Sequence, residues 1–305
     1  MTKVAFFGAS VTVQKDGYVT VFENLTKDMD ITVFRHGYGG MRLDDAGISF
    51  IDEALKDKPN YLFLDWFSPS ALCNENRLNK CLDLIVRKCF IQSIVPVFLL
   101  FDRNPFSEMR EIMYTNVIKY ADKYKINCIN LYKNENATGL LKDEVHTTII
   151  GSEFYGKRIY EVYSTLGKQP IIYEIPEKNE LFDIKYKDVD IIVNSNISIS
   201  GSFQLIGIYQ DVGYFSGLIE KIEDGKKSNS KTWDIHCHYI RKNFNISTVK
   251  YCSNLIVNVL QDNFDTSACR RIYDFTDKKR YLRIYKIFYI GVIDSLIVND
   301  NNIEL

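Results

Sequence analysis

The sequence lacks several features that mark membrane proteins and nucleic-acid-binding proteins. No apolar run approaches the roughly 18 residues that a membrane-spanning helix needs, and no basic, long apolar leader with a small-residue cleavage site opens the chain. The formal net charge is −1, so no excess of either sign favours a nucleic acid or an acidic membrane as partner. We therefore expect a cytoplasmic protein with no nucleic-acid and no membrane partner.

Paired cysteines and clustered histidines are also missing. The seven cysteines are odd in number and include no C-x-x-C spacing, which argues against a disulfide framework and against a zinc cluster. Of the four histidines, His236 and His238 would share one face of a β-strand. Two ligands do not complete a metal site, so polar surface histidines are the favoured interpretation of this pair. We expect no metal and no cofactor.

The first half of the chain contains apolar segments of strand length that alternate with segments of helical period. This alternation predicts right-handed βαβ units and a doubly wound three-layer α/β/α domain with a parallel sheet. Pro96 cannot donate a ladder hydrogen bond, so we expect pairing of its strand to begin after it. The expected strands are 4–7, 31–34, 61–64, 94–101 and 126–131, and the expected helices include 43–55, 105–124 and 149–166.

The second half loses the helical period and is rich in β-branched and aromatic residues. Its expected strands are 181–193, 198–209, 233–241, 255–260 and 282–292, with turns at 194–196 and 224–230. This pattern predicts an all-β sandwich, jelly-roll-like in type. With a linker at 167–170, we expect domains at 1–167 and 171–305. Aromatic residues of this half, such as Tyr209 and Trp233, are assigned to core packing, with a sugar-stacking platform or a dimer interface as alternatives.

A glycine and a serine follow the first expected strand. The apolar run breaks at Gly8, and Ser10 comes two residues later, before a segment with helical apolar spacing. Open α/β sheets bind their ligands at this position, beyond the carboxyl end of a strand. Two interpretations stay open for this stretch alone, because Ser10 can be a nucleophile or a helix cap.

Two further loops of the same domain carry residues suited to chemistry. The loop 35–40 ends in Gly39 and Gly40, which allow backbone N–H groups to approach a ligand, although a plain turn is an alternative. Asp143 lies three residues before His146 and can orient its imidazole ring and stabilise the protonated form. A serine nucleophile needs such a base, whereas a D-x-x-H pattern by itself more often marks a surface aspartate that caps a helix, here one that includes His146.

Together, these stretches resemble the sequence blocks of the SGNH/GDSL hydrolases. FGASVT at 7–12 is similar to the family's F-G-D-S-L-T, GYGG at 37–40 to its glycine turn, and DEVH at 143–146 to its D-x-x-H block. The resemblance covers residues 1–166 and implies a flavodoxin-like fold with serine-dependent acyl-ester chemistry. It implies Ser10 as nucleophile, His146 as base, Asp143 as its orienting group, and the N–H groups of Ser10 and Gly40 as oxyanion donors.

The sequence departs from the family pattern at two positions. Ala9 stands in place of the first block's aspartate. The third block, G-x-N-D, carries an asparagine whose amide donates to the oxyanion, and DWFS at 65–68 has none. Losing one such donor costs about 10² to 10³ in rate, unless Ser68, another group or the substrate replaces it. Asp65 and Trp66 are candidates for substrate contact, with a buried structural role as the alternative for both.

Three functions follow from these observations. The leading one is a serine esterase that removes a small acyl group, acetyl above all, from a carbohydrate; the carbohydrate part is an analogy at the level of fold. The second is an O-acyltransferase that moves acetyl to a sugar or polysaccharide precursor. The third is a non-catalytic carbohydrate-binding or assembly protein, against which the presence of Ser10, Asp143 and His146 argues. The expected ligand is a small molecule or a glycan, and a homo-oligomer is compatible with the sequence.

Overall fold

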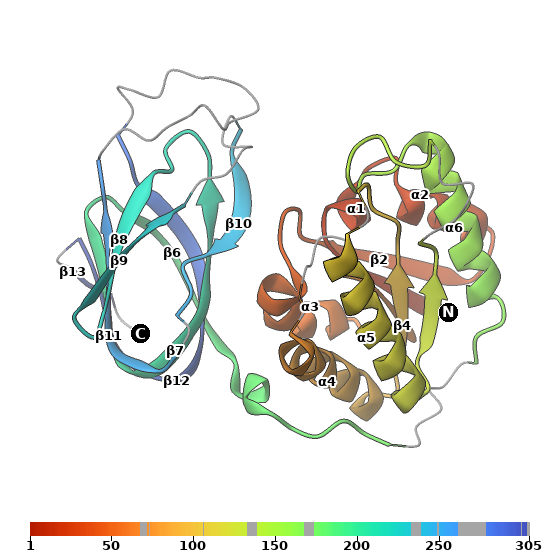
Figure 1. Ribbon diagram of the computed structural model, residues 1–305, viewed down its shortest axis with the longest axis horizontal. Coiled ribbons are helices and arrows are strands. Elements are labelled where there is room, and N and C mark those ends of the chain that lie inside the picture. Colours follow the sequence, from red (N-terminus) through yellow and green to blue (C-terminus); the bar gives the residue numbers. More distant parts are fainter. Residues whose placement is uncertain are drawn as a thin grey trace. The chain divides into compact units, whose positions relative to one another are not determined.

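The chain divides into two units, which we describe separately (Figure 1). The computed structural model describes residues 1–67, 72, 74–105, 107–132, 139–167, 174–232, 239–248, 250–261, 279–299 and 301–303. The first unit comprises Met1–Phe182 and the second comprises Asp183–Leu305, and each has most of its contacts within itself. This division falls later in the chain than the linker expected at 167–170, of which only Gly167 is described.

The first unit is built on a five-stranded parallel sheet. Its strands have the order β2-β1-β3-β4-β5, and every neighbouring pair is parallel. This is the order of flavodoxin-like folds, so the predicted doubly wound sheet is confirmed. The strands are β1 (Thr2–Gly8), β2 (Ile31–Gly37), β3 (Tyr61–Asp65), β4 (Val95–Leu100) and β5 (Asn127–Asn130).

Helices connect these strands, and three of them begin at a polar cap. The side chains of Asn74, Ser107 and Thr148 each accept a hydrogen bond from a backbone N–H three residues on, as N-caps do. The helix expected at 43–55 is interrupted, because a π-helical turn, Leu43–Gly47, precedes a separate short helix. The α-helices are α1 (Ser10–Val13), α2 (Tyr18–Thr26), α3 (Ile51–Leu55), α4 (Glu75–Ile91), α5 (Glu108–Tyr124) and α6 (Ile149–Tyr163).

Apolar side chains cover both faces of the parallel sheet. On one face, Phe6 of β1 stacks on Phe63 of β3 with ring centroids 5.0 Å apart, and α2 and α6 supply the opposing residues, among them Phe22 and Tyr155. On the other face, Phe98 of β4 packs against Tyr120 of α5. Burial on both faces explains why the strands are continuous apolar runs without a polar alternation.

Pro96 corrects one expectation, because it lies within β4 and is in register with β3. The N–H of Val95 donates to the Asn60 carbonyl on the β3 side, at 2.9 Å. The next position along the strand therefore faces β5. Pairing of β4 with β5 begins only at Val97 and Asn127, so the N–H that proline lacks would have had no ladder partner.

The second unit is an antiparallel all-β domain. Its sheet has the order β13-β12-β7-β11-β8-β9, with β10 beside β7 and β6 beside β12. A short 3₁₀ helix, Glu180–Asp183, precedes it in the chain. The strands are β6 (Lys185–Val193), β7 (Asn196–Val212), β8 (Leu218–Glu223), β9 (Lys226–Lys231), β10 (Arg241–Asn245), β11 (Cys252–Val259), β12 (Leu282–Val298) and β13 (Asn301–Ile303).

Two long strands bend at glycines and fold this sheet into a sandwich. The first part of β12 pairs with β6 and with the end of β7, whereas its last part pairs with β13 and with the start of β7. Gly201 and Gly291 lie at the change, with φ of +148° and +101°. Such bends allow one strand to serve both layers. The predicted all-β sandwich is therefore confirmed, with an apolar core between its layers.

The hairpin of β8 and β9 corrects the turn expected at 224–230. Only Asp224 and Gly225 form the turn, both with positive φ, and the following residues pair with β8. A two-residue Asp-Gly turn of this kind matches the twist of antiparallel strands. The expected strand at 233–241 falls mostly on residues that the structure does not describe, as do Trp233, His236 and His238.

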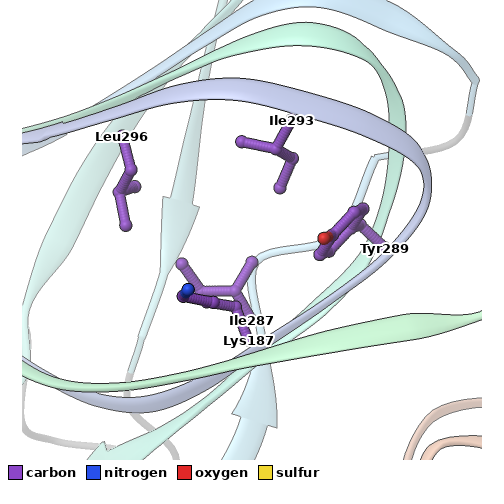
Figure 2. A pocket seen from close by; sticks show the side chains of 5 residues that line it. All are labelled: Lys187, Ile287, Tyr289, Ile293 and Leu296. Atoms are coloured by element: carbon purple, nitrogen blue, oxygen red, sulfur yellow. The ribbon is translucent and has the colours of Figure 1, made fainter. Parts of the chain in front are cut away.

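A small apolar cavity of about 100 Å³ lies in the second unit (Figure 2). Its walls are side chains of β6 and β12, and Figure 2 shows them around a common space: Lys187, Ile287, Tyr289, Ile293 and Leu296. None of the residues predicted to carry chemistry lines it.

Across the described ranges, the structure contains no helix with the length and apolar character needed to cross a bilayer.

Candidate active site

Ser10 lies where the order of the parallel strands reverses. In the ladder, Gly8 at the end of β1 is in register with Gly37 of β2 and with Asp65 of β3, so three strand ends lie side by side. Ser10 is the first residue of α1 and is partly exposed. A Cβ at Gly8 would lie 2.6 Å from the Asp65 carbonyl oxygen, so the chain can leave the sheet here only with a glycine.

The glycine turn runs directly beside Ser10. A Cβ placed on Gly39 would be 3.8 Å from the Ser10 Cβ, which is van der Waals contact. The Tyr38 N–H donates to the Gly8 carbonyl at 2.9 Å and attaches this turn to the end of β1. Gly40 is exposed and has a φ of +76°, a left-handed conformation that favours glycine. Gly39 and Ser10, predicted separately, are therefore neighbours.

Asp143 and His146 form a pair within one turn. Nδ1 of the His146 ring lies 3.0 and 2.9 Å from the two carboxylate oxygens of Asp143. The same carboxylate accepts hydrogen bonds from the backbone N–H groups of Val145 and His146, at 3.0 and 2.8 Å. This local arrangement, typical of aspartate in turns, aims the Asp143 carboxylate at Nδ1, so Nε2 is the ring nitrogen that points away from the carboxylate.

The surroundings of Asp143 keep it ionised. Partial burial by itself would raise the pKa of the Asp143 carboxyl, but the two backbone N–H donors and the His146 ring lower it, to about 2. A carboxylate accepts hydrogen bonds and does not donate them, so the His146 nitrogen that faces it carries the proton. The pair thus holds the ring in one tautomer.

A hydrogen-bonded clamp joins the His146 turn to the Ser10 turn. The side-chain amide of Gln14, the C-cap residue of α1, donates from Nε2 to the Thr147 carbonyl at 2.8 Å. Its Oε1 accepts from the Thr147 N–H and from the Thr147 hydroxyl, both at 3.2 Å. Residues 14 and 147 are 133 positions apart, yet Gln14 is in the turn that begins with Ser10, and Thr147 follows His146.

The loop after β4 anchors the other side of the His146 turn. The Arg103 guanidinium donates to the Glu144 carboxylate at 2.6 Å, and the Asn104 N–H donates to the Glu144 carbonyl at 2.9 Å. The turn that carries Asp143 and His146 is therefore held from two directions. Both anchors come from loops at the carboxyl ends of parallel strands, where active sites of open α/β sheets are found.

Asp65 and Trp66 lie beneath this surface and are fully buried. The Asp65 carboxylate accepts hydrogen bonds from the Thr12 hydroxyl at 3.1 Å and from the Tyr18 hydroxyl at 3.4 Å. Burial, and then the charge of Asp65, raise the pKa of Tyr18 well above its ordinary value. Trp66 packs edge-to-face on Phe7, with ring centroids 5.0 Å apart. Burial supports the structural alternative for both residues.

Ser68, the proposed substitute for the missing asparagine, lies outside the described residues. The segment just before it is held by Arg110 of α5, whose guanidinium donates to the Phe67 carbonyl at 2.6 Å. Within the described ranges, no three histidine, cysteine, aspartate or glutamate side chains are grouped closely enough to hold a metal ion.

Sequence reasoning missed Gln14, Thr147 and Arg103. No local pattern signals a glutamine that binds a backbone 133 residues away. Glutamine and threonine are also not residue types that by themselves indicate catalysis. Glu144 lies inside the predicted D-x-x-H stretch, but its partner on the β4 loop could not be read from spacing.

Comparison with solved structures finds the same fold over the whole chain. A two-domain esterase active on acetylated mannans, crystallised with mannopentaose, is 12% identical, with a TM-score of 0.64 over 95% of this chain and 91% of its own. A second structure of such an esterase is 10% identical, with a TM-score of 0.63 over 96% of this chain and 92% of that one. Both likenesses show an α/β/α domain followed by an all-β domain.

An acetyl xylan esterase is similar over 52% of this chain and 98% of its own, with 20% identity and a TM-score of 0.46. No protein-family model and no curated protein sequence matches the chain.

Proposed function

We propose that the protein is a serine ester hydrolase of SGNH type that removes a small acyl group, acetyl above all, from a carbohydrate. The observation that carries the proposal is the Asp143–His146 pair, held by Gln14 on the turn that begins with Ser10. A binding protein has no need of an ionised carboxylate that orients a histidine on a turn joined to that of a partly exposed serine.

The proposed reaction uses the groups of this turn in two steps. In the first, the Ser10 oxygen attacks the ester carbonyl carbon while its proton passes to Nε2 of His146. The carbon–oxygen bond to the sugar then breaks, the sugar oxygen takes that proton, and the acyl group stays on Ser10. In the second step, water attacks the acyl-enzyme and gives a proton to His146. The carboxylic acid leaves, and Ser10 regains its proton.

The N–H groups of Ser10 and Gly40 are the proposed donors to the tetrahedral oxyanion. Ser10 opens α1, where backbone N–H groups have no partner within the helix. Gly39, next to Gly40, lies close enough to Ser10 that a Cβ added to it would be 3.8 Å from the Ser10 Cβ. A third donor, which the absent asparagine would have supplied, is left to Ser68, to another group or to the substrate, and its loss would lower the rate by about 10² to 10³.

The substrate proposal rests on the likeness in fold to an esterase active on acetylated mannans. By this reasoning, the substrate is an acetylated glycan, and the all-β domain accompanies the catalytic one for glycan recognition. Transfer of acetyl to a sugar hydroxyl is the second candidate, because the departure at 65–68 removes a donor that ordinary ester hydrolysis uses. A location in the cytoplasm and a homo-oligomeric state stay predictions.

The first test is the turnover of nitrophenyl acetate by the wild type and by Ser10→Ala. The variant should lose acyl transfer and keep its fold, because a partly exposed serine gives up only one hydroxyl. Ser164→Ala, an exposed serine after α6, is the matched control and should keep wild-type activity. An organophosphonate probe should label the wild type at Ser10 and leave Ser10→Ala unlabelled.

An assay of an acetylated mannan, with and without a free sugar acceptor, then separates hydrolysis from transfer. Release of acetate that does not depend on the acceptor supports the hydrolase. Turnover of the mannan that increases only when the acceptor is present supports the transferase. Turnover by Ser10→Ala at the wild-type rate would contradict the assignment of Ser10 as the nucleophile. A wild type without turnover and without label would favour the non-catalytic alternative.

A further inference from the structure

We propose that Gln14 is a positioning residue that sets how the His146 ring meets Ser10, by holding Thr147 as a neighbouring β-strand would. This inference rests on the proposed function of the same site. The side chain of Gln14 binds Thr147, which adjoins His146, and this contact keeps two short, separately folded turns aligned.

The backbone of Thr147 faces Gln14 for a geometric reason. Leu141 and Thr147 form an isolated antiparallel bridge. Its hydrogen bonds come from the flanking residues, Lys142 N–H to the His146 carbonyl and Thr148 N–H to the Leu140 carbonyl, both at 2.9 Å. In such a pair, the N–H and the carbonyl of Thr147 itself point away from the bridge. They would be left without a ladder partner, and the Gln14 amide takes both.

A glutamine side chain is chemically suited to this role. Its side-chain amide carries an NH₂ donor group and a carbonyl acceptor, the same two kinds of group that a peptide unit has, and it uses both on the backbone of Thr147. The Thr147 hydroxyl, which also binds Gln14, lies 2.6 Å from the Ser152 hydroxyl of α6. Thr147 is buried, with 1% of its surface exposed. The contact is therefore partly shielded from water, and breaking it leaves the buried polar groups of Thr147 unsatisfied.

The main chain of Gln14 is also held at its own end. The Gly17 N–H donates to the Gln14 carbonyl at 3.0 Å, and the Arg35 guanidinium of β2 donates to the same oxygen at 3.4 Å. Arg35 in turn forms an ion pair with Glu23 of α2, at 2.8 Å. The Gln14 side chain thus connects the His146 turn to a stretch of main chain that is itself held in place within the first domain.

The Gln14 contact affects how Ser10 is aligned with His146. The helix α1 has only four residues, too few to be stable without tertiary contacts, so its contacts with the rest of the domain determine where Ser10 lies. Gln14 supplies such a contact at one end and places Thr147, and with it the adjoining His146, relative to that helix. A misplacement of about 1 Å between a nucleophile and its base costs about 10²-fold in rate.

The experiment compares Gln14→Ala and Gln14→Glu with Gln92→Ala, an exposed glutamine after α4 that serves as the matched control. Gln14→Glu keeps the length and the acceptor but loses the donor to the Thr147 carbonyl. With nitrophenyl acetate, well below each Tm, we expect kcat to fall about 10- to 100-fold in Gln14→Ala, with KM changed less than about threefold. Gln14→Glu should lie between Gln14→Ala and the wild type, and Gln92→Ala should match the wild type.

Amide hydrogen exchange provides a readout that does not depend on turnover. The Thr147 N–H should exchange faster in Gln14→Ala than in the wild type, because its acceptor is gone, and should stay protected in Gln92→Ala. A wild-type kcat in Gln14→Ala, or unchanged exchange at Thr147, would overturn the role of Gln14 in an enzyme that still needs Ser10. Turnover that is absent from the wild type, or independent of Ser10, would instead overturn the proposed function.

Discussion

At the residue scale, the candidate site depends on a pair that one turn of chain can build. Asp143 and His146 are three residues apart, and the Asp143 carboxylate binds the backbone N–H groups that lead to the histidine. The same oxygens then face the ring. Because all these contacts are local, the pair forms whenever the turn forms, and the contact between the two side chains was predictable from their spacing.

Asp143→Asn should lower kcat strongly and leave the fold intact. An asparagine has one oxygen, which cannot serve the backbone donors and the ring as the two carboxylate oxygens do, and it cannot stabilise the protonated ring by charge. We expect a loss of about 10²- to 10⁴-fold in kcat on nitrophenyl acetate. Asp122→Asn, at an exposed position of α5, is the control. A variant with more than about half of wild-type kcat would contradict the role given to Asp143.

The pH dependence of stability gives a second test of the same pair. The pKa of Asp143 is about 2 in the folded protein and 3.8 ordinarily, so the fold favours the ionised form. This contribution is present above about pH 4 and is lost as the pH falls towards about 2. The difference in free energy of unfolding between wild type and Asp143→Asn should therefore be larger at about pH 6 than at about pH 3. A difference that grows on acidification would rule out this assignment.

At the element scale, glycines decide where the strands of the all-β domain change partners. Gly201 and Gly291 lie in adjacent strands, where a Cβ on either would press on a backbone oxygen of the other strand, Val292 O and Ser202 O respectively. Both have positive φ, a conformation that other residues avoid. Without these bends, β7 and β12 would extend as one flat sheet.

Gly291→Ala should destabilise the all-β domain. An alanine held in a left-handed conformation lowers the free energy of unfolding by about 1 to 3 kcal/mol, and its Cβ would also press on the Ser202 carbonyl oxygen. Gly225→Ala is the matched control, because that glycine also has positive φ but a Cβ there would meet nothing within 4 Å. In urea unfolding followed by circular dichroism, Gly291→Ala should lose at least twice the free energy of unfolding that Gly225→Ala loses. Equal losses would argue that the close contact at Gly291 is relieved without cost.

At the scale of the whole molecule, the first domain extends beyond its last helix. After α6, residues 174–182 still contact α4. The Arg87 guanidinium donates to the Pro176 carbonyl at 2.7 Å, and Lys80 forms an ion pair with Glu180 at 2.7 Å. Leu181 is buried, with 1% of its surface exposed. The contacts with α4 hold this segment on the α/β domain, and it belongs to the first unit.

A fragment of residues 1–182 should therefore be more stable than one of residues 1–167. Burial of one leucine contributes about 1.5 to 3 kcal/mol, and the Arg87 hydrogen bond adds to it. Thermal unfolding of the two fragments, followed by circular dichroism, is the measurement. Leu181→Ala in the longer fragment is a further variant that should lower its Tm towards that of the shorter one. Identical Tm values for the two fragments would show that the segment is not part of the folded unit.

The sequence by itself determined what depends on neighbours in the chain. The alternation of apolar strands and helices predicted the parallel sheet, and the spacing of Asp143 and His146 predicted their pair. In both cases, the physical cause acts over a few residues, through periodicity and local hydrogen bonds. The Asp224-Gly225 dipeptide carries the same kind of local signal, although the turn expected at 224–230 is longer than the two residues that form it.

Only the tertiary structure decided which distant residues meet. The Gln14 amide binds a backbone 133 positions away, and Asp65 and Trp66 are buried where loop position alone allowed exposure. The tolerance of Pro96 depended on which neighbouring strand its missing N–H would face. These outcomes follow from the path of the whole chain, because a hydrogen bond or a buried face depends on the partner that the fold brings to it.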